Sequence, residues 1–197
     1  MYRVATIKDL VRVPPNFFAM DIKEAIKQLL REKYERKIDR DLGVILSIDN
    51  VRDISIGKVI AGDGASYHWV TFDALVFMPE VNEIVEGEIT EVVEFGVFMR
   101  MGPLEGLIHL SQITNDFLSY DKKIPAFIGK ESNRIIRKGD TVIAKISTVS
   151  LKSSIPETKI GLTMRPEGLG KHDWIAEQKE QKPKEKKSGK KAEEVKE

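Results

Sequence analysis

Residues 84–110 read IVEGEITEVVEFGVFMRMGPLEGLIHL, and this stretch decides the fold of the second half of the chain. It holds three β-prone segments, 84–93, 96–101 and 107–110, with a break at Gly102-Pro103. Two further segments of the same kind follow at 141–149 and 159–164. Five short strands in so little chain predict a small closed barrel of the OB type.

A long connection, residues 111–138, separates the third of these strands from the fourth. A structureless loop of this length is uncommon inside a compact domain. We therefore expect a helical turn near 118–120 and an excursion that serves a function or faces a partner.

The first half of the chain predicts strands and one helix, which makes the fold class α+β. The expected elements are a strand over 2–13, a helix over 22–36, β-prone segments over 44–48 and 54–60, and a strand over 67–77. The helix has Asp21 at its N-cap position and an apolar stripe at helical spacing, and Gly43 stops the run. Gly62-Asp63-Gly64 predicts a hairpin turn, because the paired glycines supply the positive φ of tight turns.

Composition excludes several classes of protein. The 197 residues contain no cysteine, so there is no disulfide, cysteine–zinc site or cysteine nucleophile. The net charge of +1 does not by itself indicate a nucleic-acid binder. The chain lacks a run of about 18 apolar residues and a signal-peptide start, so no membrane segment is expected. Residues 176–197 are rich in Lys and Glu and predict a charged, disordered tail.

No catalytic constellation is present in the sequence. The three histidines are far apart and form no HxH or HExxH pair, and no phosphate-binding glycine loop occurs. His109-Leu110-Ser111 has neither an orienting acid nor an oxyanion hole. We therefore expect no catalytic residue, no metal and no cofactor, and a chain that is not catalytic by itself.

Binding residues are better supported. If the barrel closes as expected, Phe95, Phe98 and His109 lie on neighbouring strands of one face, where aromatic rings stack on single-stranded bases. The phosphate-holding cations are then Arg100, Lys145 and Lys159. The alternative, which spacing alone favours, is that one or both phenylalanines belong to the barrel core.

Several blocks of the second half resemble the S1-type RNA-binding domain over residues 82–165. The blocks are Gly87-Glu88-Ile89, Phe95-Gly96-Val97-Phe98, Gly106-Leu107-Ile108-His109-Leu110-Ser111, Lys138-Gly139-Asp140 and Lys159-Ile160-Gly161-Leu162-Thr163. The resemblance implies an RNA-facing patch of Phe95, Phe98 and His109, with Lys159 beside it. Ser150 stands where the family often has aspartate. This departure favours loose, backbone-led RNA binding.

The first half of the chain, together with motifs in the second half, resembles the stalk subunits of DNA-directed RNA polymerase, the family of the archaeal E-prime stalk component and the seventh subunit of eukaryotic polymerase II. Motifs that carry this resemblance include Tyr2-Arg3-Val4, Phe72-Asp73-Ala74-Leu75-Val76-Phe77-Met78-Pro79 and Asn115-Asp116-Phe117-Leu118-Ser119-Tyr120-Asp121. The resemblance covers residues 1–175. It implies a truncated RNP-like tip domain of antiparallel sheet and helix over 1–79, an S1 barrel over 80–165 and a C-terminal extension over 166–175.

The resemblance also implies a function. A stalk subunit of this kind forms a heterodimer with a smaller stalk partner, component F of the archaeal polymerase, and plugs its tip domain into core RNA polymerase. It binds emerging single-stranded RNA and supports initiation, with initiation factors, and elongation. Core contact is then expected at Gly62, Asp63 and Gly64, and the location is expected to be an archaeal cytoplasm. The alternative is an RNA-binding cap subunit of an RNA exosome, but the KH domain or zinc ribbon expected after its S1 domain does not appear in this sequence.

Overall fold

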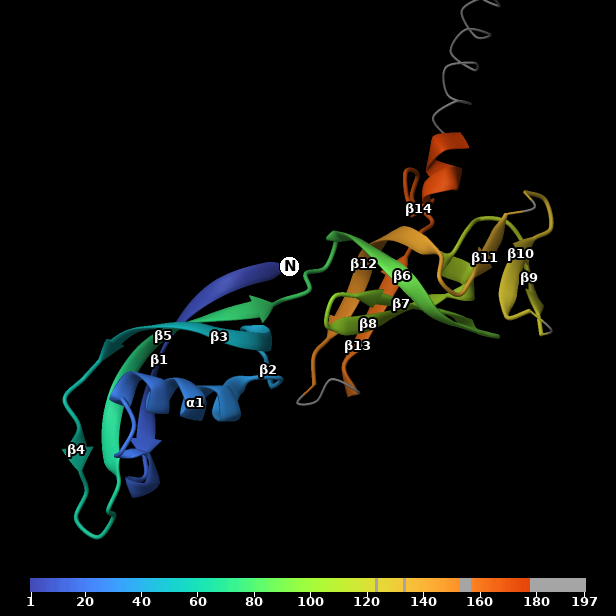
Figure 1. The fold of residues 1–197 in the computed structure, drawn as a ribbon. Helices are drawn as coiled ribbons and strands as arrows, with labels where there is room; N and C mark the ends of the chain where they lie inside the picture. The colour runs from blue at the N-terminus through green and yellow to red at the C-terminus, as the bar shows by residue number, and fades with distance from the viewer. Residues whose placement is uncertain (123, 133, 153–156, 178–197) are drawn as a thin grey trace, which may run out of the picture. The chain divides into compact units, whose positions relative to one another are not determined.

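The computed structural model describes residues 1–122, 124–132, 134–152 and 157–177, and it divides into two compact units (Figure 1). The first unit comprises Met1–Pro79 with Leu151–Thr158, and the second comprises Glu80–Ser150 with the chain from Lys159 onward. The first contains β1 (Tyr2–Val13), the 3-10 turn η1 (Pro15–Phe17), α1 (Ile22–Tyr34), β2 (Ile38–Asp39), β3 (Gly43–Ile54), β4 (Lys58–Val59) and β5 (Ser66–Phe77). The second contains β6 (Ile84–Val93), β7 (Gly96–Met101), β8 (Leu104–His109), the 3-10 turn η2 (Leu110–Gln112), β9 (Leu118–Asp121), β10 (Ala126–Gly129), β11 (Ile135–Arg137), β12 (Thr141–Ser150), β13 (Lys159–Thr163) and β14 (Gly170–Lys171).

The first unit is an antiparallel sheet covered on one face by α1 (Figure 1). The strand order is β1-β5-β3-β2, and β4 pairs with β5. The Asp21 side chain caps α1 by accepting a hydrogen bond from the Lys23 backbone N at 3.1 Å. Ile26 and Leu30 are fully buried from the helix side and belong to the same core as Phe72 of β5. The expected combination of sheet and helix is therefore confirmed.

Three local expectations in this unit are wrong. The helix ends at Tyr34, not at residue 36, because Glu35 is extended and Arg36 has a φ of 64°. Gly43 therefore does not stop the helix and instead begins β3, where an added Cβ would lie 2.3 Å from the Phe77 carbonyl oxygen. The two β-prone segments have other bounds than expected, since β3 extends the first over Gly43–Ile54 and only Lys58–Val59 of the second forms a strand, β4.

The second unit is built around a closed five-stranded barrel. Strands follow the order β13-β8-β7-β6-β12, and β12 pairs back onto β13 to close the ring. Strands β8 and β13 run parallel, and the other barrel pairs run antiparallel. Alternate residues of β7, such as Val97 and Met99, point inward and are fully buried. The expected OB-type barrel is confirmed.

The connection between β8 and β12 differs from the expectation of a helical turn at 118–120. Residues 118–121 form β9, which pairs antiparallel with β10, and β10 pairs with β11. We call these three strands the insertion sheet. Its inner face buries Phe127 and Ile136, and Tyr120 contacts the Phe127 ring with centroids 5.4 Å apart. These long-range contacts outweigh the weak local preference of the segment for a helical turn.

The residues after the barrel pair with it through β14 and β12, and a buried carboxylate, Asp140, adds two hydrogen bonds. Asp140 accepts hydrogen bonds from the Lys171 ammonium at 3.0 Å and from the Arg137 backbone N at 3.0 Å. Residues 172–177 are helical, and within them Trp174 is buried with the Arg134 guanidinium 5.4 Å from its ring. The tail predicted over 176–197 lies, from residue 178 onward, outside the described residues.

Candidate nucleic-acid interface

Two phenylalanines and a histidine meet at one end of the outer face of β7 and β8. Gly96 pairs with His109 in the β7–β8 ladder, and the Leu110 backbone N donates to the Phe95 carbonyl oxygen at 2.9 Å. The Phe95 and Phe98 rings are in edge-to-face contact with centroids 6.3 Å apart. We call Phe95, Phe98 and His109 the aromatic patch.

The phenylalanines of this patch lie outside the barrel core. Phe95 is 52% exposed, whereas Phe98 is half-buried between Glu91 of β6 and Leu107 of β8 in the sheet. The neighbouring Val97 and Met99 occupy the interior with 0% exposure. Alternation along β7 therefore directs Phe98 outward, where its ring is accessible to a stacking base.

His109 presents one ring nitrogen to solvent. Its Nδ1 accepts a hydrogen bond from the Ser111 backbone N at 3.2 Å and lies 2.9 Å from Ser111 Oγ. Because Nδ1 accepts from the backbone amide, the neutral ring carries its proton on Nε2. The exposed Nε2–H is then a donor available to a phosphate or base oxygen.

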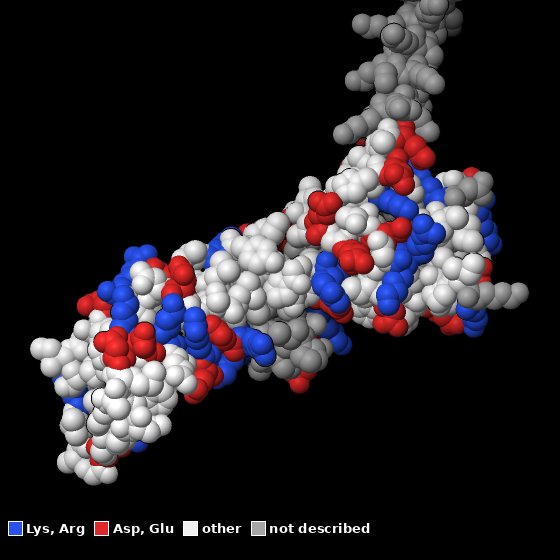
Figure 2. Space-filling view, viewed as in Figure 1, with Lys and Arg blue, Asp and Glu red and all other residues white. Residues whose placement is uncertain are grey.

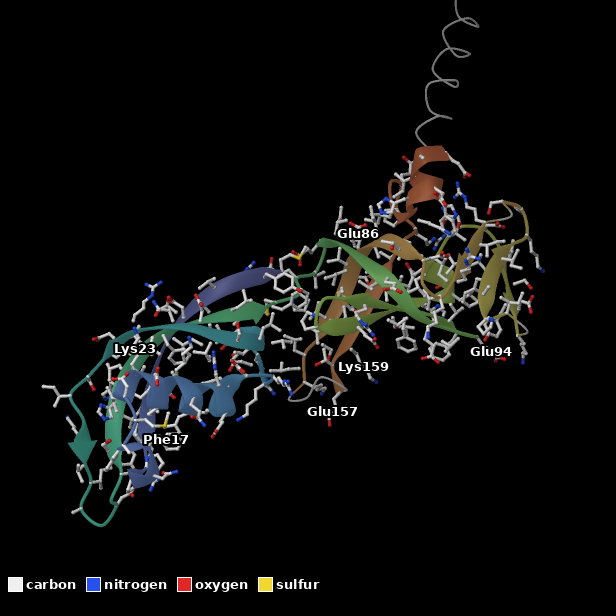
Figure 3. All side chains as sticks on the ribbon, in the orientation of Figure 1. Phe17, Lys23, Glu86, Glu94, Glu157 and Lys159 are labelled. Carbon is white, nitrogen blue, oxygen red and sulfur yellow. The ribbon has the colours of Figure 1, made fainter. Side chains whose placement is uncertain are left out.

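The three expected cations do not form one cluster with the aromatic patch. Arg100 shares the outer face of β7 with Phe98, but it pairs with Glu105 at 3.7 Å and lies opposite Glu88. Lys159 lies at the start of β13, as Figure 3 shows, and pairs with Ser150 in the ladder with β12.

Lys145 is farther from the aromatic patch by strand order, because it sits on β12 between Ile84 of β6 and Thr163 of β13. Glu88 and Glu105, which flank Arg100, offset its positive charge on the outer face of β7. Figure 2 shows the same balance more widely, with Lys and Arg interspersed among Asp and Glu over the visible face.

The loop between β4 and β5, residues 60–65, contains the three residues expected to contact core polymerase. Asp63 accepts from Arg12 Nε at 2.8 Å, from Arg12 Nη2 at 2.7 Å and from the Tyr67 hydroxyl at 2.6 Å. The bidentate Arg12 contact, followed by the Tyr67 hydrogen bond, lowers the pKa of Asp63 well below its ordinary range. The Asp63 carboxylate thus ties the loop to Arg12 of β1 and Tyr67 of β5.

The turn chemistry of this loop differs from the expectation. Gly62 has a φ of +88°, whereas Gly64 lies outside the positive-φ region, so the paired glycines do not both supply positive φ. The loop is also longer than a tight two-residue hairpin, because the last pair of the β4–β5 ladder is Val59 with Ser66. The Asp63 hydrogen bonds stabilise this longer connection.

Exposed apolar residues near this loop were not singled out by the sequence. Ile56, Val59 and Ile60 are 92%, 72% and 53% exposed. Figure 2 shows the end of the first unit around β4 and the 60–65 loop as mostly uncharged surface. The sequence placed them in a β-prone segment, 54–60, and only their exposure in the structure shows that the first unit leaves them uncovered.

Signals for other kinds of site are absent from the part of the chain that the structure describes. Residues 1–122, 124–132, 134–152 and 157–177 contain no group of three or more His, Cys, Asp or Glu side chains placed to hold a metal ion. Over the same residues, no helix combines the length and the hydropathy that a membrane span requires.

Comparison with known families matches both units of the chain. Residues 8–64 match the model of the SHS2 domain found in the N terminus of Rpb7p/Rpc25p/MJ0397. Residues 78–155 match the model of the S1 RNA binding domain. The solved structure of Mycoplasma genitalium RNase R in complex with ribose methylated single-stranded RNA overlaps 42% of this chain and 13% of that chain, with 28% identity and a TM-score of 0.37, which is too low to support a conclusion.

Similarity to curated proteins extends along most of the chain. DNA-directed RNA polymerase subunit Rpo7 of Saccharolobus shibatae is 42% identical over 179 residues, which span 91% of this chain and 99% of that protein. DNA-directed RNA polymerase II subunit RPB7 of Saccharomyces cerevisiae is 27% identical over 79% of this chain and 97% of that protein. DNA-directed RNA polymerase III subunit RPC8 of the same yeast is 38% identical over 49% of this chain and 46% of that protein. With both domain models in the expected order and a relative of this identity matched from end to end, the chain belongs to the Rpo7 family of DNA-directed RNA polymerase subunits.

Proposed function

We propose that this chain is a non-catalytic stalk subunit of a DNA-dependent RNA polymerase, with residues 1–79 as the tip domain, 80–165 as the RNA-binding domain and 166–175 as an extension. The observation that carries the proposal is the similarity to Rpo7 over 91% of this chain and 99% of the relative. The relatives described above are polymerase subunits, which gives no support to the exosome alternative. Similarity to archaeal relatives favours the cytoplasm as the location.

The second unit binds emerging single-stranded RNA in this proposal. The aromatic patch supplies stacking surfaces, and Arg100, Lys145 and Lys159 supply positive charge. Glu91 pairs with Phe98 across β6 and β7, and Arg100 pairs with Glu88 of β6 and with Glu105 of β8. These acids make the attraction for phosphates modest. Weak, sequence-tolerant RNA binding suits a subunit that contacts whatever transcript the enzyme makes, during initiation with its factors and during elongation.

The first unit anchors the subunit to core polymerase through the 60–65 loop. Gly62 has open space where a side chain would stand, so another backbone can approach it closely. Val59 and Ile60 add exposed apolar surface beside it. Exposed apolar surface of this kind commonly marks a protein–protein interface. Asp63 holds the loop in shape, and its carboxylate is occupied by Arg12.

The smaller stalk partner, component F of the polymerase, covers a second apolar surface of the first unit. Leu10 and Trp69 are directly paired across β1 and β5, on the sheet face opposite α1, and both are partly exposed. The Lys8 ammonium lies 5.9 Å from the Trp69 ring centre. An exposed tryptophan beside an apolar and a basic side chain is typical of an interface.

Reconstitution tests the anchoring step. The double variant Val59→Ser, Ile60→Ser removes apolar contact from exposed positions without opening the core, so the unit stays folded by circular dichroism. We expect it to lose stoichiometric association with core polymerase in a pull-down. The matched control Val4→Ser, which changes an exposed valine of β1, is expected to assemble normally. Full assembly by the double variant would refute docking through this loop.

A further inference from the structure

The outer face of the insertion sheet carries an exposed aromatic ring. Phe117, just before β9, is 75% exposed, and its carbonyl oxygen accepts from the Lys130 backbone N at 2.9 Å. Alternation places Phe117 on the face that holds Ile128 and Ile135, which pair directly across β10 and β11. The opposite face is the one that buries Phe127. Phe117 therefore has no packing role that explains an aromatic side chain.

An ion pair joins this sheet to the turn that bears the aromatic patch. The Lys122 ammonium, directly after β9, lies 2.7 Å from a Glu94 carboxylate oxygen, and Glu94 precedes Phe95. Figure 3 shows Glu94 beyond the end of β6 and next to β9. Phe117 lies five residues before Lys122, or about 16 Å along an extended strand. The Lys122 end of β9 therefore adjoins the turn that carries Phe95, and Phe117 lies at the other end of that strand.

The charge of this segment differs from that of the barrel face. Residues 113–138 carry six Lys or Arg against three Asp or Glu, a net charge of +3 in a chain whose total is +1. Asp116, one of the three acids, is held by the backbone N atoms of Glu131 and Ser132 and by the Ser132 hydroxyl. Three of the six cations pair with carboxylates outside this segment, namely Lys122 with Glu94, Arg134 with Glu177 and Arg137 with Asp140. Among the described residues Lys130 makes no such ion pair, whereas Arg100 on the barrel pairs with Glu105. Lys130 is therefore the cation of the insertion sheet that a phosphate can approach.

We propose that the outer face of the insertion sheet is a second RNA subsite, in which Phe117 stacks on a base and Lys130 holds a phosphate of the same strand. This inference rests on the proposed RNA-binding function and extends it beyond the barrel. A single strand leaving the aromatic patch passes the Glu94–Lys122 pair and continues along β9. Binding sites of OB-type barrels span about 4–16 nucleotides, so such an extension is within the usual range.

Oligomer length separates the two subsites. The full chain is titrated with labelled single-stranded RNA of about 4 and about 12 nucleotides, the first matching a barrel site alone. For Phe117→Ala we expect affinity for the longer RNA to fall at least about 5-fold and affinity for the shorter RNA to stay within about 2-fold. Phe117→Tyr keeps the ring and is expected to bind both RNAs like the wild type. Phe117→Leu keeps apolar area without the ring and is expected to behave like Phe117→Ala.

Salt dependence tests the phosphate contact. Lys130→Gln is expected to reduce the log–log salt slope for the longer RNA by about 0.7, the value for one phosphate on a single strand. Lys23→Gln, which removes an exposed lysine from α1, is the matched control and is expected to leave the slope unchanged. An unchanged slope for Lys130→Gln would refute its contact with phosphate.

Four outcomes distinguish the possible roles of this face. Unchanged binding of the longer RNA by Phe117→Ala, or equal losses for both RNAs, would overturn the second subsite. If Phe117→Ala keeps its RNA affinity but loses association with the smaller stalk partner or core polymerase, the face binds protein and the inference is wrong. If the wild type binds neither oligomer, the proposed RNA-binding function itself fails. If Phe98→Ala weakens the short oligomer while Phe117→Ala changes nothing, only the second subsite fails.

Discussion

Replacing Phe98 by alanine separates an RNA-binding ring from a structural one. The ring is half-buried on the outer face of β7 and contacts Phe95 edge to face. A fully buried Phe→Ala change costs about 3–5 kcal/mol, whereas an aromatic pair contributes about 0.5–1.5 kcal/mol beyond area burial. We therefore expect Phe98→Ala to lower the free energy of unfolding by about 1–2 kcal/mol. Met99→Ala, at 0% exposure on the same strand, is the matched control and is expected to cost about 2–5 kcal/mol.

For RNA affinity we expect the larger loss from Phe98→Ala and the smaller from Met99→Ala, the reverse of their order in stability. Stacking on one base contributes about 1–3 kcal/mol, so Phe98→Ala should weaken binding by about 5- to 150-fold. Met99→Ala should leave the affinity of the folded fraction close to that of the wild type, because its side chain points into the barrel.

The assay uses the two tryptophans of the chain, Trp69 in the first unit and Trp174 in the second. In a Trp69→Phe background, fluorescence during urea unfolding reports on the second unit alone, and anisotropy of labelled RNA reports binding. The reasoning is refuted if Phe98→Ala loses as much stability as Met99→Ala while its folded fraction binds RNA normally. That result would make Phe98 a core residue.

Two further predictions concern stability. Because Arg12 lowers the folded-state pKa of Asp63 below the ordinary 3.8, the ionised carboxylate stabilises the first unit above that pH, and the stabilisation is lost as the pH falls through the lower folded-state pKa. Asp63→Asn should therefore melt below the wild type at pH 7, with a gap in melting temperature that persists at pH 4 and closes only in stronger acid; equal melting at pH 7 would contradict this. Gly96→Ala places a Cβ 2.3 Å from the Ile108 carbonyl oxygen and should cost about 1–3 kcal/mol or more in urea unfolding, whereas Gly64→Ala, whose nearest contact is 3.6 Å, should stay within about 0.5 kcal/mol of the wild type.

Local patterns were sufficient for the regular elements of both units. The β-prone segments 84–93 and 96–101 predicted β6 and β7 at the residues where the structure has them. Asp21 and the apolar stripe behind it predicted the start of α1. Such signals are local, because a strand with one buried face alternates and a helix repeats every 3.6 residues, whatever they pack against.

The sequence by itself determined the fold class, the order of the two domains and the family, because periodicity, glycine breaks and short motifs are written in consecutive residues. Only the tertiary structure decided that the connection between β8 and β12 contains the insertion sheet, since Phe127 is buried there through pairing with β9 and β11. It alone joined Arg12 to Asp63 and Lys122 to Glu94, pairs that are 51 and 28 residues apart. Contacts at such separations depend on how strands register and how loops close, and no local preference of either residue specifies them.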